Sequence, residues 1–313
     1  MDKLDKWIQT TKYKDYDFSI ASADASFRKY YRLSSLHDNF IVMDSSLELS
    51  SLSPFVDVTK RLLHVGVKAP FIFEKNLDDG YLILEDFGSR ALLDVLNVTN
   101  FKALYAKAMD EIIKMQKADT KGLPLYDEAF LHFEMDLMSE WYLQKKLKLT
   151  LHDNDKKMLE KSLKSISNFV LSQPQDVFVH RDYHSRNIML TPKDEIGVID
   201  YQDAMNGAIT YDLVSLLKDC YIAFDRESVE ELVLHFRDKK GLDTEDAEFI
   251  KWFDFMGLQR HIKVLGVFSR LYLRDGKDGY LKDIPLTLKY TIDTALRYEE
   301  TKELAHFLQR VTS

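Results

Sequence analysis

The sequence predicts an α+β fold in two parts, a small mostly antiparallel sheet with a helix, followed by a larger, mainly helical part. Two observations support this prediction. Short strand-like runs separated by turns fill about the first 85 residues. From Ala91 onward, apolar residues instead recur at the 3.6-residue spacing of helices. We therefore expect two lobes, residues 1–86 and residues 87–313.

The amino-terminal lobe is expected to contain two pairs of strands and two helices. Pro54 suits the first turn of a helix, and Gly66 lies just past the end of the same helix. The runs 34–39 and 76–80 have the composition of turns. The expected elements are a helix over Leu4–Thr10, strands over Phe27–Leu33 and Phe40–Asp44, a helix over Pro54–His64, and strands over Phe71–Glu74 and Tyr81–Leu84.

The carboxy-terminal lobe is expected to be helical with one exception. Apolar side chains at positions 101, 104, 108, 112 and 115 fall on one face of a helix. The exception is Val177–Tyr201, which contains short apolar runs and turns. The other expected helices cover Phe130–Leu149, Lys156–Leu171, Tyr211–Phe224, Ala247–Leu273 and Leu286–Val311.

Composition narrows the class of protein. The chain has 313 residues, 45% hydrophobic and 30% charged, as in ordinary globular proteins. A formal net charge of −8 argues against a general nucleic-acid binder. The single cysteine, Cys220, excludes an intramolecular disulfide and a cysteine-based zinc site, and its apolar surroundings predict a small core residue in a helix.

Targeting and membrane-spanning segments have characteristic sequence patterns. No signal-peptide pattern follows Met1, and no apolar run approaches the ~18 residues of a membrane span. We therefore expect a cytoplasmic protein without a membrane partner, and we expect a monomer.

The most informative stretch is His180–Asn187, which has the pattern H-R-D-x-x-x-x-N of the catalytic loop of protein kinases and their small-molecule relatives. In such a loop Asp182 is placed to accept the hydrogen bond or proton of an attacking hydroxyl. His180 is expected to hold the backbone that presents Asp182. A single Asp or Asn is more often a turn former, but four matches at fixed offsets favour catalysis.

A second acidic site follows thirteen residues after Asn187. Asp200 ends the short apolar run Ile196–Ile199, which comes after a turn-like segment. Its carboxylate and the amide oxygen of Asn187 are the hard oxygen ligands that Mg²⁺ prefers. We therefore predict phosphoryl transfer from ATP with Mg²⁺, with Asp182, Asn187 and Asp200 as catalytic residues and the last two as metal ligands.

The tripeptide Asp86-Phe87-Gly88 spells the magnesium-binding D-F-G of a protein kinase, but it precedes the catalytic loop instead of following it. We therefore interpret Glu85–Gly88 as the hinge between the lobes. Glu85 and Phe87 are expected to contact the adenine of the nucleotide.

The segment Ser22–Arg28 occupies the place of a phosphate-covering loop but lacks the glycines of a protein-kinase loop. Its small residues would still let backbone N–H groups and a hydroxyl approach phosphate. Ser22, Asp24 and Ser26 are therefore candidate nucleotide contacts. A plain turn before a strand is the alternative.

The strand over Phe40–Asp44 offers Met43 where kinases carry a lysine that grips the phosphates. Methionine cannot neutralise phosphate. Arg28 and Arg32 share one face of the preceding strand because they are four residues apart. We hypothesise that one of them replaces the lysine. The alternative is a solvated strand face.

With these motifs in hand, the chain resembles the aminoglycoside phosphotransferase/choline kinase superfamily, and more narrowly the bacterial anomeric N-acetylmuramate/N-acetylglucosamine kinases. The catalytic motifs indicate only the superfamily, whereas the amino-terminal loop and the segment around Gln259 favour the sugar kinases. Met43 in place of lysine is shared by that branch. The similar segments are Ala23–Tyr30, Ile41–Asp44, His180–Asn187, Ile199–Ala204, Thr210–Leu217, Gly257–Gly266 and Leu273–Gly276.

The resemblance implies transfer of the γ-phosphate of ATP to the anomeric C1 hydroxyl of an N-acetylated amino sugar in peptidoglycan recycling. A cation would suit the lactyl carboxylate of N-acetylmuramate, so Gln259, Arg260 and Lys263 are candidate acceptor contacts. Asp203 is a candidate to bind substrate or a water beside the metal. Asp212 is expected to cap a helix or to hold the catalytic loop.

Two alternatives remain open at this point. The first is a kinase of aminoglycosides, whose polycationic acceptors would favour a carboxylate-rich pocket. The second is a non-catalytic nucleotide-binding protein, which would have no need of the base Asp182.

Overall fold

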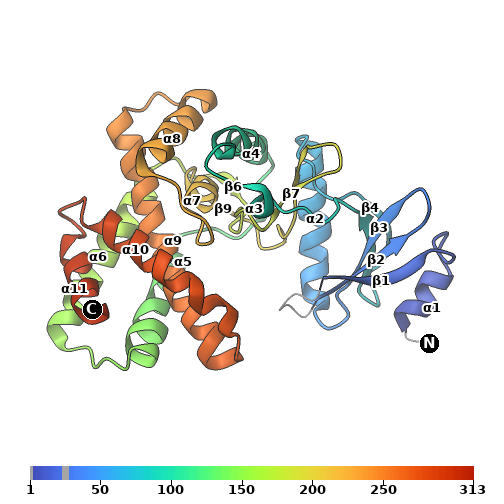
Figure 1. The fold of residues 1–313 in the computed structure, drawn as a ribbon. Helices are drawn as coiled ribbons and strands as arrows, with labels where there is room; N and C mark the ends of the chain where they lie inside the picture. Colours follow the sequence, from blue (N-terminus) through green and yellow to red (C-terminus); the bar gives the residue numbers. More distant parts are fainter. Residues whose placement is uncertain (1–2, 23–27) are drawn as a thin grey trace. The chain divides into compact units, whose positions relative to one another are not determined.

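The computed structural model describes residues 3–22 and 28–313. The chain forms two compact units (Figure 1). The first unit comprises Met1–Val95 and Arg186–Ala204, and the second comprises Leu96–Ser185 and Met205–Ser313. A strand-rich first unit and a helix-rich second unit confirm the predicted α+β class.

A five-stranded antiparallel sheet forms the first unit, in the order β1-β2-β3-β5-β4. The register places Tyr30 opposite Met43. The first strand, β1, was not predicted, because its Ser19, Ala21 and Ser22 have the composition of a loop. The strands are β1 (Asp17–Ser22), β2 (Lys29–Ser34), β3 (Asn39–Asp44), β4 (Ile72–Asn76) and β5 (Tyr81–Glu85).

The two faces of this sheet bury different side chains. Leu33, Val42 and Ile83 form a buried cluster with Leu4 and Ile8 of α1 (Lys3–Gln9) on one face. Met43 and Leu82 are also fully buried but alternate with that set along their strands, so they point to the opposite face. The remaining helices of the unit are η1 (Leu49–Ser51), α2 (Leu52–His64) and α3 (Leu92–Val95).

A hairpin of β7 (Ile188–Leu190) and β8 (Ile196–Val198) belongs to the first unit although it follows the catalytic loop in sequence. The Leu190 N–H donates to the Arg90 carbonyl at 2.9 Å, and the Val198 N–H donates to the Lys68 carbonyl at 2.9 Å. Because of these bonds, residues 87–95 and 186–204 lie with the amino-terminal unit, and the compact units differ from the single expected boundary after residue 86.

The second unit is built around α9 (Asp246–Asp275), which contacts most of the other helices of the unit (Figure 1). The three-residue strands β6 and β9 pair as a two-stranded sheet, which is the only sheet of this unit among the described residues. The other elements are α4 (Phe101–Met115), α5 (Glu128–Leu137), η2 (Met138–Lys146), α6 (Asp153–Ser172), β6 (Val177–Val179), β9 (Met205–Gly207), α7 (Tyr211–Leu217), α8 (Arg226–Lys240), η3 (Asp278–Asp283), α10 (Ile284–Ala295) and α11 (Lys302–Thr312).

Three of the expected helices were wrong in extent. The expected Phe130–Leu149 helix changes at Met138 into the π-helix η2. Where α5 meets η2, α9 packs closely against the chain. A Cβ added at Gly266 of α9 would lie 2.3 Å from the Leu137 carbonyl carbon. The expected Leu286–Val311 helix is two helices, because the Thr301 hydroxyl bonds the Ala295 carbonyl at the end of the first.

The third correction concerns the expected Tyr211–Phe224 helix, which ends at Leu217. Cys220 lies beyond it in a turn, although it is buried as predicted. Helix α8 was missed altogether, since most of its residues are polar.

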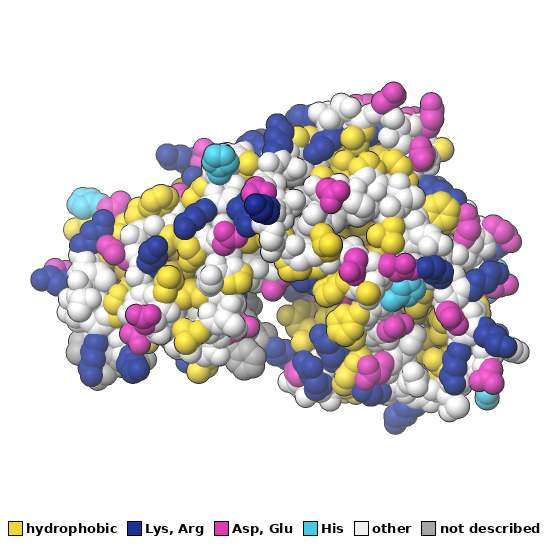
Figure 2. Space-filling model, turned by 180° about the vertical axis from the view of Figure 1, so that it is seen from behind, with side chains coloured by type: hydrophobic (Ala, Val, Ile, Leu, Met, Phe, Trp, Pro, Cys, Tyr) yellow, Lys and Arg dark blue, Asp and Glu magenta, His cyan; other side chains and the backbone are white. Residues whose placement is uncertain are grey.

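The surface carries charges of both signs. Figure 2 shows basic and acidic side chains interspersed over the face that it displays. Within the described part of the chain, no helix has both the length and the apolar character needed to cross a membrane.

Candidate active site

The start of the catalytic loop is held by Asp212, in the first turn of α7. Its buried carboxylate accepts the His180 N–H at 2.8 Å and the Arg181 N–H at 3.1 Å. Arg181 adopts a φ of 76°, a strained conformation for a residue with a side chain. Burial raises the pKa of Asp212 although the hydrogen bonds oppose it. Asp212 therefore holds the loop, one of the two roles expected for it.

His180 holds the backbone of the catalytic loop at Asp182. Its ring is fully buried, and its Nδ1 accepts the Asp182 N–H at 3.3 Å. This is the backbone-holding role expected of His180. The hydroxyl of the following residue, Tyr183, donates to the Ala108 carbonyl of α4 at 2.9 Å, which fixes the loop against the helical core.

Cations surround the Asp182 carboxylate. Burial on its own would raise the pKa of Asp182, but the nearby cations, of which Lys263 acts most strongly, outweigh burial and lower that pKa to about 2. Asp182 is therefore ionised at any ordinary pH. The other groups with this effect are His184, Arg260 and Arg181.

Lys263 and Arg260 extend from α9 toward the same loop. Arg260 donates to the Arg181 carbonyl at 2.8 Å and to the Tyr211 hydroxyl at 3.1 Å. Lys263 donates to the Tyr211 hydroxyl at 3.2 Å and pairs with Glu134 at 3.0 Å. The structure thus brings both expected cations to the catalytic loop.

Gln259 lies deeper on the same helix and is fully buried. Its amide donates to the Tyr126 hydroxyl at 2.9 Å and to Glu134 at 3.1 Å. At this buried position Gln259 is better placed to hold the surrounding side chains than to contact an acceptor directly.

The expected metal ligands lie in the first unit. Asn187 Nδ2 donates to Asp200 Oδ2 at 3.1 Å, across the base of the β7–β8 hairpin. Asp200 is exposed and has a φ of 66°. The Gln202 amide links Asp200 to Asp203, with distances of 3.0 and 3.1 Å.

This oxygen-rich group fits Mg²⁺ by its chemistry. In the described parts of the chain, no three His, Cys, Asp or Glu side chains gather closely enough to hold a metal ion alone. Mg²⁺ commonly uses one or two carboxylates and completes its shell with phosphates and water. Asp200 and Asn187 would hold such an ion, with Asp203 next to them.

Hydrogen bonds hold Asp86, within the segment expected to form the hinge. Arg32 pairs with Asp86 through two bonds of 2.6 and 3.2 Å, and Asp86 also accepts the Gly88 N–H at 2.7 Å. The carboxylate that looks like a magnesium ligand in sequence thus bonds Arg32 and Gly88. Phe87 is buried on Gly197, where a Cβ would lie 2.5 Å from its ring.

The remaining nucleotide candidates lie around the amino-terminal strands. Arg28 is buried and donates to the Ser51 hydroxyl at 3.3 Å, with Glu48 3.7 Å away. Glu85 pairs with Lys68 at 3.2 Å. Ser22 ends β1, whereas Asp24 and Ser26 lie outside the described residues.

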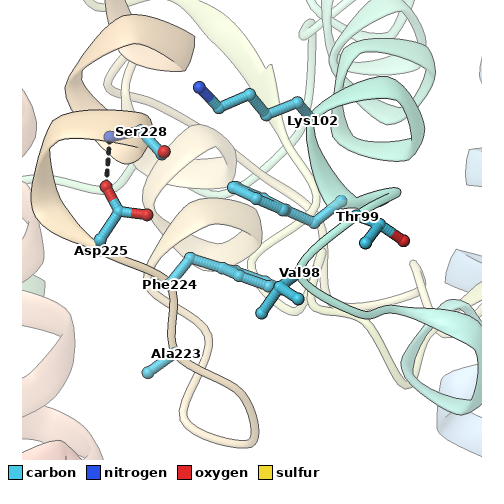
Figure 3. Close-up of a pocket in the computed structure, with 8 residues that line it drawn as sticks. Val98, Thr99, Lys102, Ala223, Phe224, Asp225 and Ser228 are labelled. Carbon is cyan, nitrogen blue, oxygen red and sulfur yellow. Dashed lines mark hydrogen bonds between the residues drawn. The ribbon is translucent and has the colours of Figure 1, made fainter.

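A separate hollow of about 520 Å³ opens beside α4 and the start of α8 (Figure 3). Phe101 and Phe224 stack there with their ring centroids 3.9 Å apart. Asp225 in its wall accepts the Ser228 N–H as a helix cap. None of the expected site residues lines this hollow.

Comparison with known proteins identifies the family. The sequence profile described as "Phosphotransferase enzyme family" matches residues 17–249, more than half of the chain. The chain belongs to the phosphotransferase enzyme family. It is a phosphotransferase that acts on a hydroxyl acceptor, and the resemblance inferred from its motifs is confirmed.

Two curated relatives carry one name. A protein of Neisseria meningitidis serogroup B is 38% identical, over 96% of this chain and 93% of the relative. A protein of Pseudomonas aeruginosa is 37% identical, over 92% of this chain and 86% of the relative. Both are named N-acetylmuramate/N-acetylglucosamine kinase.

Solved structures share the fold of the phosphotransferase. An ADP-bound aminoglycoside phosphotransferase superposes with a TM-score of 0.65 at 15% identity, over 94% of this chain and 99% of that one. A choline kinase from Streptococcus pneumoniae gives 0.64 at 12% identity, over 93% and 98%. The kinase-like fold predicted from the sequence is thus confirmed.

Sequence reasoning missed two carboxylates of the phosphotransferase. Glu134 of α5 binds Lys263 and Arg181, and Asp219 bonds Ser185 within the catalytic loop. Glu134 had a signal: it falls on the apolar face of α5, three residues after the buried Leu131. An acidic residue on such a face needs a buried partner.

Proposed function

We propose that this phosphotransferase transfers the γ-phosphate of ATP to the C1 hydroxyl of N-acetylmuramate, N-acetylglucosamine or both, in cell-wall recycling. The observation that carries the proposal is the name shared by the relatives that are 35–38% identical over more than nine-tenths of this chain. Dependence on ATP would also place the reaction in the cytoplasm.

In the proposed reaction Asp182 receives the acceptor hydroxyl. With a pKa of about 2 it is a weak base, so its main contribution is to orient the hydroxyl and to take the proton late, as the P–O bond forms. An anomeric hydroxyl is more acidic than an ordinary alcohol and needs less activation. Bound Mg²⁺ would neutralise charge on the phosphates.

The nucleotide is proposed to bind the lobe of residues 1–86 and the acceptor the lobe of residues 87–313. Glu85 and Phe87 of the hinge, with Ser22, Asp24, Ser26 and one of the two arginines, are the proposed nucleotide contacts. Asn187 and Asp200 would hold the metal. Arg260 and Lys263 are the proposed cationic contacts of the acceptor, with Gln259 supporting them and Asp203 near the metal.

An aminoglycoside acceptor is the second candidate, favoured by the fold of the solved structures. The side chains that lower the pKa of Asp182 are cationic, and like charges facing a polycation would weaken its binding. This supports the amino sugar over the aminoglycoside.

An ATP-dependent assay with a panel of acceptors tests the proposal. The panel holds both acetylated sugars, an aminoglycoside, choline and homoserine. We expect turnover of at least one acetylated sugar and much slower turnover of the rest. Turnover of the aminoglycoside or of choline alone would overturn the proposal, and no transfer to any acceptor would favour a nucleotide-binding protein.

The role of Asp182 has its own test. Asp182→Asn should lose roughly 10²–10⁴-fold in kcat, the range of a general base, while it still binds ATP. Near-normal turnover would remove Asp182 from this role.

A further inference from the structure

Glu134 is a buried carboxylate with four donors, and no motif assigns it a role. Its Oε1 faces the Arg181 guanidinium at 2.7 Å and the Lys263 ammonium at 3.0 Å. Its Oε2 accepts bonds from the Tyr126 hydroxyl and from the Gln259 amide. The side chain of Glu134 is only 4% exposed, so an acceptor cannot touch it directly.

Both cations that Glu134 binds also act on Asp182. Lys263 and Arg181 both lower the pKa of Asp182. Their side chains remain 12% and 18% exposed, in contrast to Glu134. A ligand can therefore contact these two cations. The negative charge of Glu134 reduces the net positive charge that such a ligand encounters.

The backbone around Glu134 is fixed by close packing of α5 on α9. One turn further along α5, Leu137 lies against Gly266, where no Cβ would fit. On α9 the residues Gln259, Lys263 and Gly266 follow at helical spacing, so one face of α9 bonds Glu134 and packs Leu137. The backbone that presents Glu134 to its cations is therefore fixed by the packing of the two helices.

We propose that Glu134 is a specificity-determining residue that acts as an internal counter-anion, so that one acceptor site takes both a neutral and a carboxylate-bearing amino sugar. This inference rests on the proposed function. Without Glu134, two partly buried cations would lose their shared carboxylate, which would favour an anionic acceptor and penalise a neutral one. With Glu134 in place, the site discriminates weakly between them.

The test compares kcat/KM of wild type and Glu134→Gln with two acceptors. N-acetylmuramate and N-acetylglucosamine share the sugar ring and differ by the lactyl carboxylate, so their ratio isolates the effect of charge. We expect the ratio to shift toward N-acetylmuramate by about tenfold or more, because one unit charge at close range is worth nearly tenfold even when water screens it fully, and more near a protein surface. The shift should decline as salt is added.

A matched control lies on the same helix. Glu128→Gln removes an exposed carboxylate of α5 that pairs with Lys164, and it should leave the ratio unchanged. A purely structural effect of Glu134→Gln would lower kcat/KM for both sugars by the same factor, and that result would overturn the inference.

A second variant covers the case in which Glu134→Gln does not fold. Lys263→Gln should shift the ratio the opposite way, toward N-acetylglucosamine, and an unchanged ratio would contradict the inference. If both single variants fold, Glu134→Gln/Lys263→Gln should return close to the wild-type ratio, because the two charges are removed together.

The outcome separates this inference from the proposed function. If wild type phosphorylates neither acetylated sugar, both fail. If wild type phosphorylates them and the ratio stays constant across the variants, the proposed function stands and only the role of Glu134 is lost.

Discussion

The carboxylate of Asp219 holds Ser185 by two bonds, one from its backbone N–H at 2.9 Å and one from its hydroxyl. Both residues are buried. Ser185 lies in the catalytic loop between Asp182 and Asn187. Asp219 thus fixes the far end of the loop whose start is fixed by Asp212.

Asp219→Asn should therefore impair catalysis from outside the site. Asp219 accepts from Ser185 with one oxygen and from the Tyr221 N–H with the other, so an amide must place its NH2 group against one of these donors. The loop then shifts, and small misplacement of catalytic groups can cost up to ~10²-fold. We expect kcat to fall between tenfold and 100-fold, on the same estimate, with little change in KM for ATP. Asp225→Asn, at an exposed helix cap, is the control and should retain its kcat. Equal kcat values for the two variants would refute the prediction.

The arginine hypothesis now makes a finer prediction. Arg28→Ala or Arg32→Ala, whichever removes the arginine that replaces the lysine, should raise KM for ATP by about tenfold, because a charge-assisted bond is lost. Because Arg32 binds the hinge through Asp86, Asp86→Asn should reproduce the effect of Arg32→Ala but not that of Arg28→Ala. Steady-state kinetics with varied ATP measures this. An unchanged KM in both arginine variants would show that neither replaces the missing lysine.

Asp254 on α9 supports stability by holding two cations inside the second unit. It is fully buried and accepts bonds from Lys218 at 3.1 Å and from Arg226 at 2.6 and 2.8 Å. Asp254→Ala leaves these cations without their carboxylate, which should cost about 3–5 kcal/mol of the free energy of unfolding. Urea denaturation measures it, with the exposed Asp243→Ala as the control, expected within ~0.5 kcal/mol of wild type. A loss below ~1 kcal/mol for Asp254→Ala would contradict this account.

The ionised carboxylate of Glu134 should also make the stability of the folded protein sensitive to acid. Burial would raise its pKa, but Lys263 and Arg181 lower it from 4.5 to about 2. Because the folded-state pKa is the lower one, the stabilisation is fully present above the unfolded-state pKa and is lost as the pH falls toward 2. The loss amounts to roughly 3 kcal/mol.

The comparison of wild type with Glu134→Gln isolates this effect, since Asp182 titrates in both proteins. Urea denaturation between pH 5 and pH 3 should show the stability advantage of wild type shrinking as the pH falls. A constant difference over that range would mean that Glu134 is not the titrating group.

The candidate catalytic residues could be located in the sequence because kinase chemistry requires fixed spacing within a short stretch of chain. Asp182, Asn187 and Asp200 lie within about twenty residues of one another. The order of the motifs also separated Asp86 from the candidate metal site, and Asp86 bonds Arg32 and Gly88 instead. The hinge role of Glu85–Gly88 stays a prediction. Much of the helix pattern followed from periodicity, as α4 and α9 show.

What could not be predicted depends on contacts between distant segments. Glu134 pairs with Lys263, which lies 129 residues further along the chain. Local patterns in a single sequence do not reveal such a long-range pair. The π-helix after Leu137 arises from close approach to Gly266, a tertiary cause that overrides local propensity. Helix α8 has too few apolar residues for its period to stand out.

The central claim is phosphoryl transfer to the anomeric hydroxyl. NMR of the product formed from ATP and N-acetylglucosamine tests it most directly. The account predicts coupling between phosphorus and the C1 proton, that is, a sugar 1-phosphate. Coupling of phosphorus to the C6 protons instead would contradict the anomeric assignment and leave only a hydroxyl phosphotransferase of this fold.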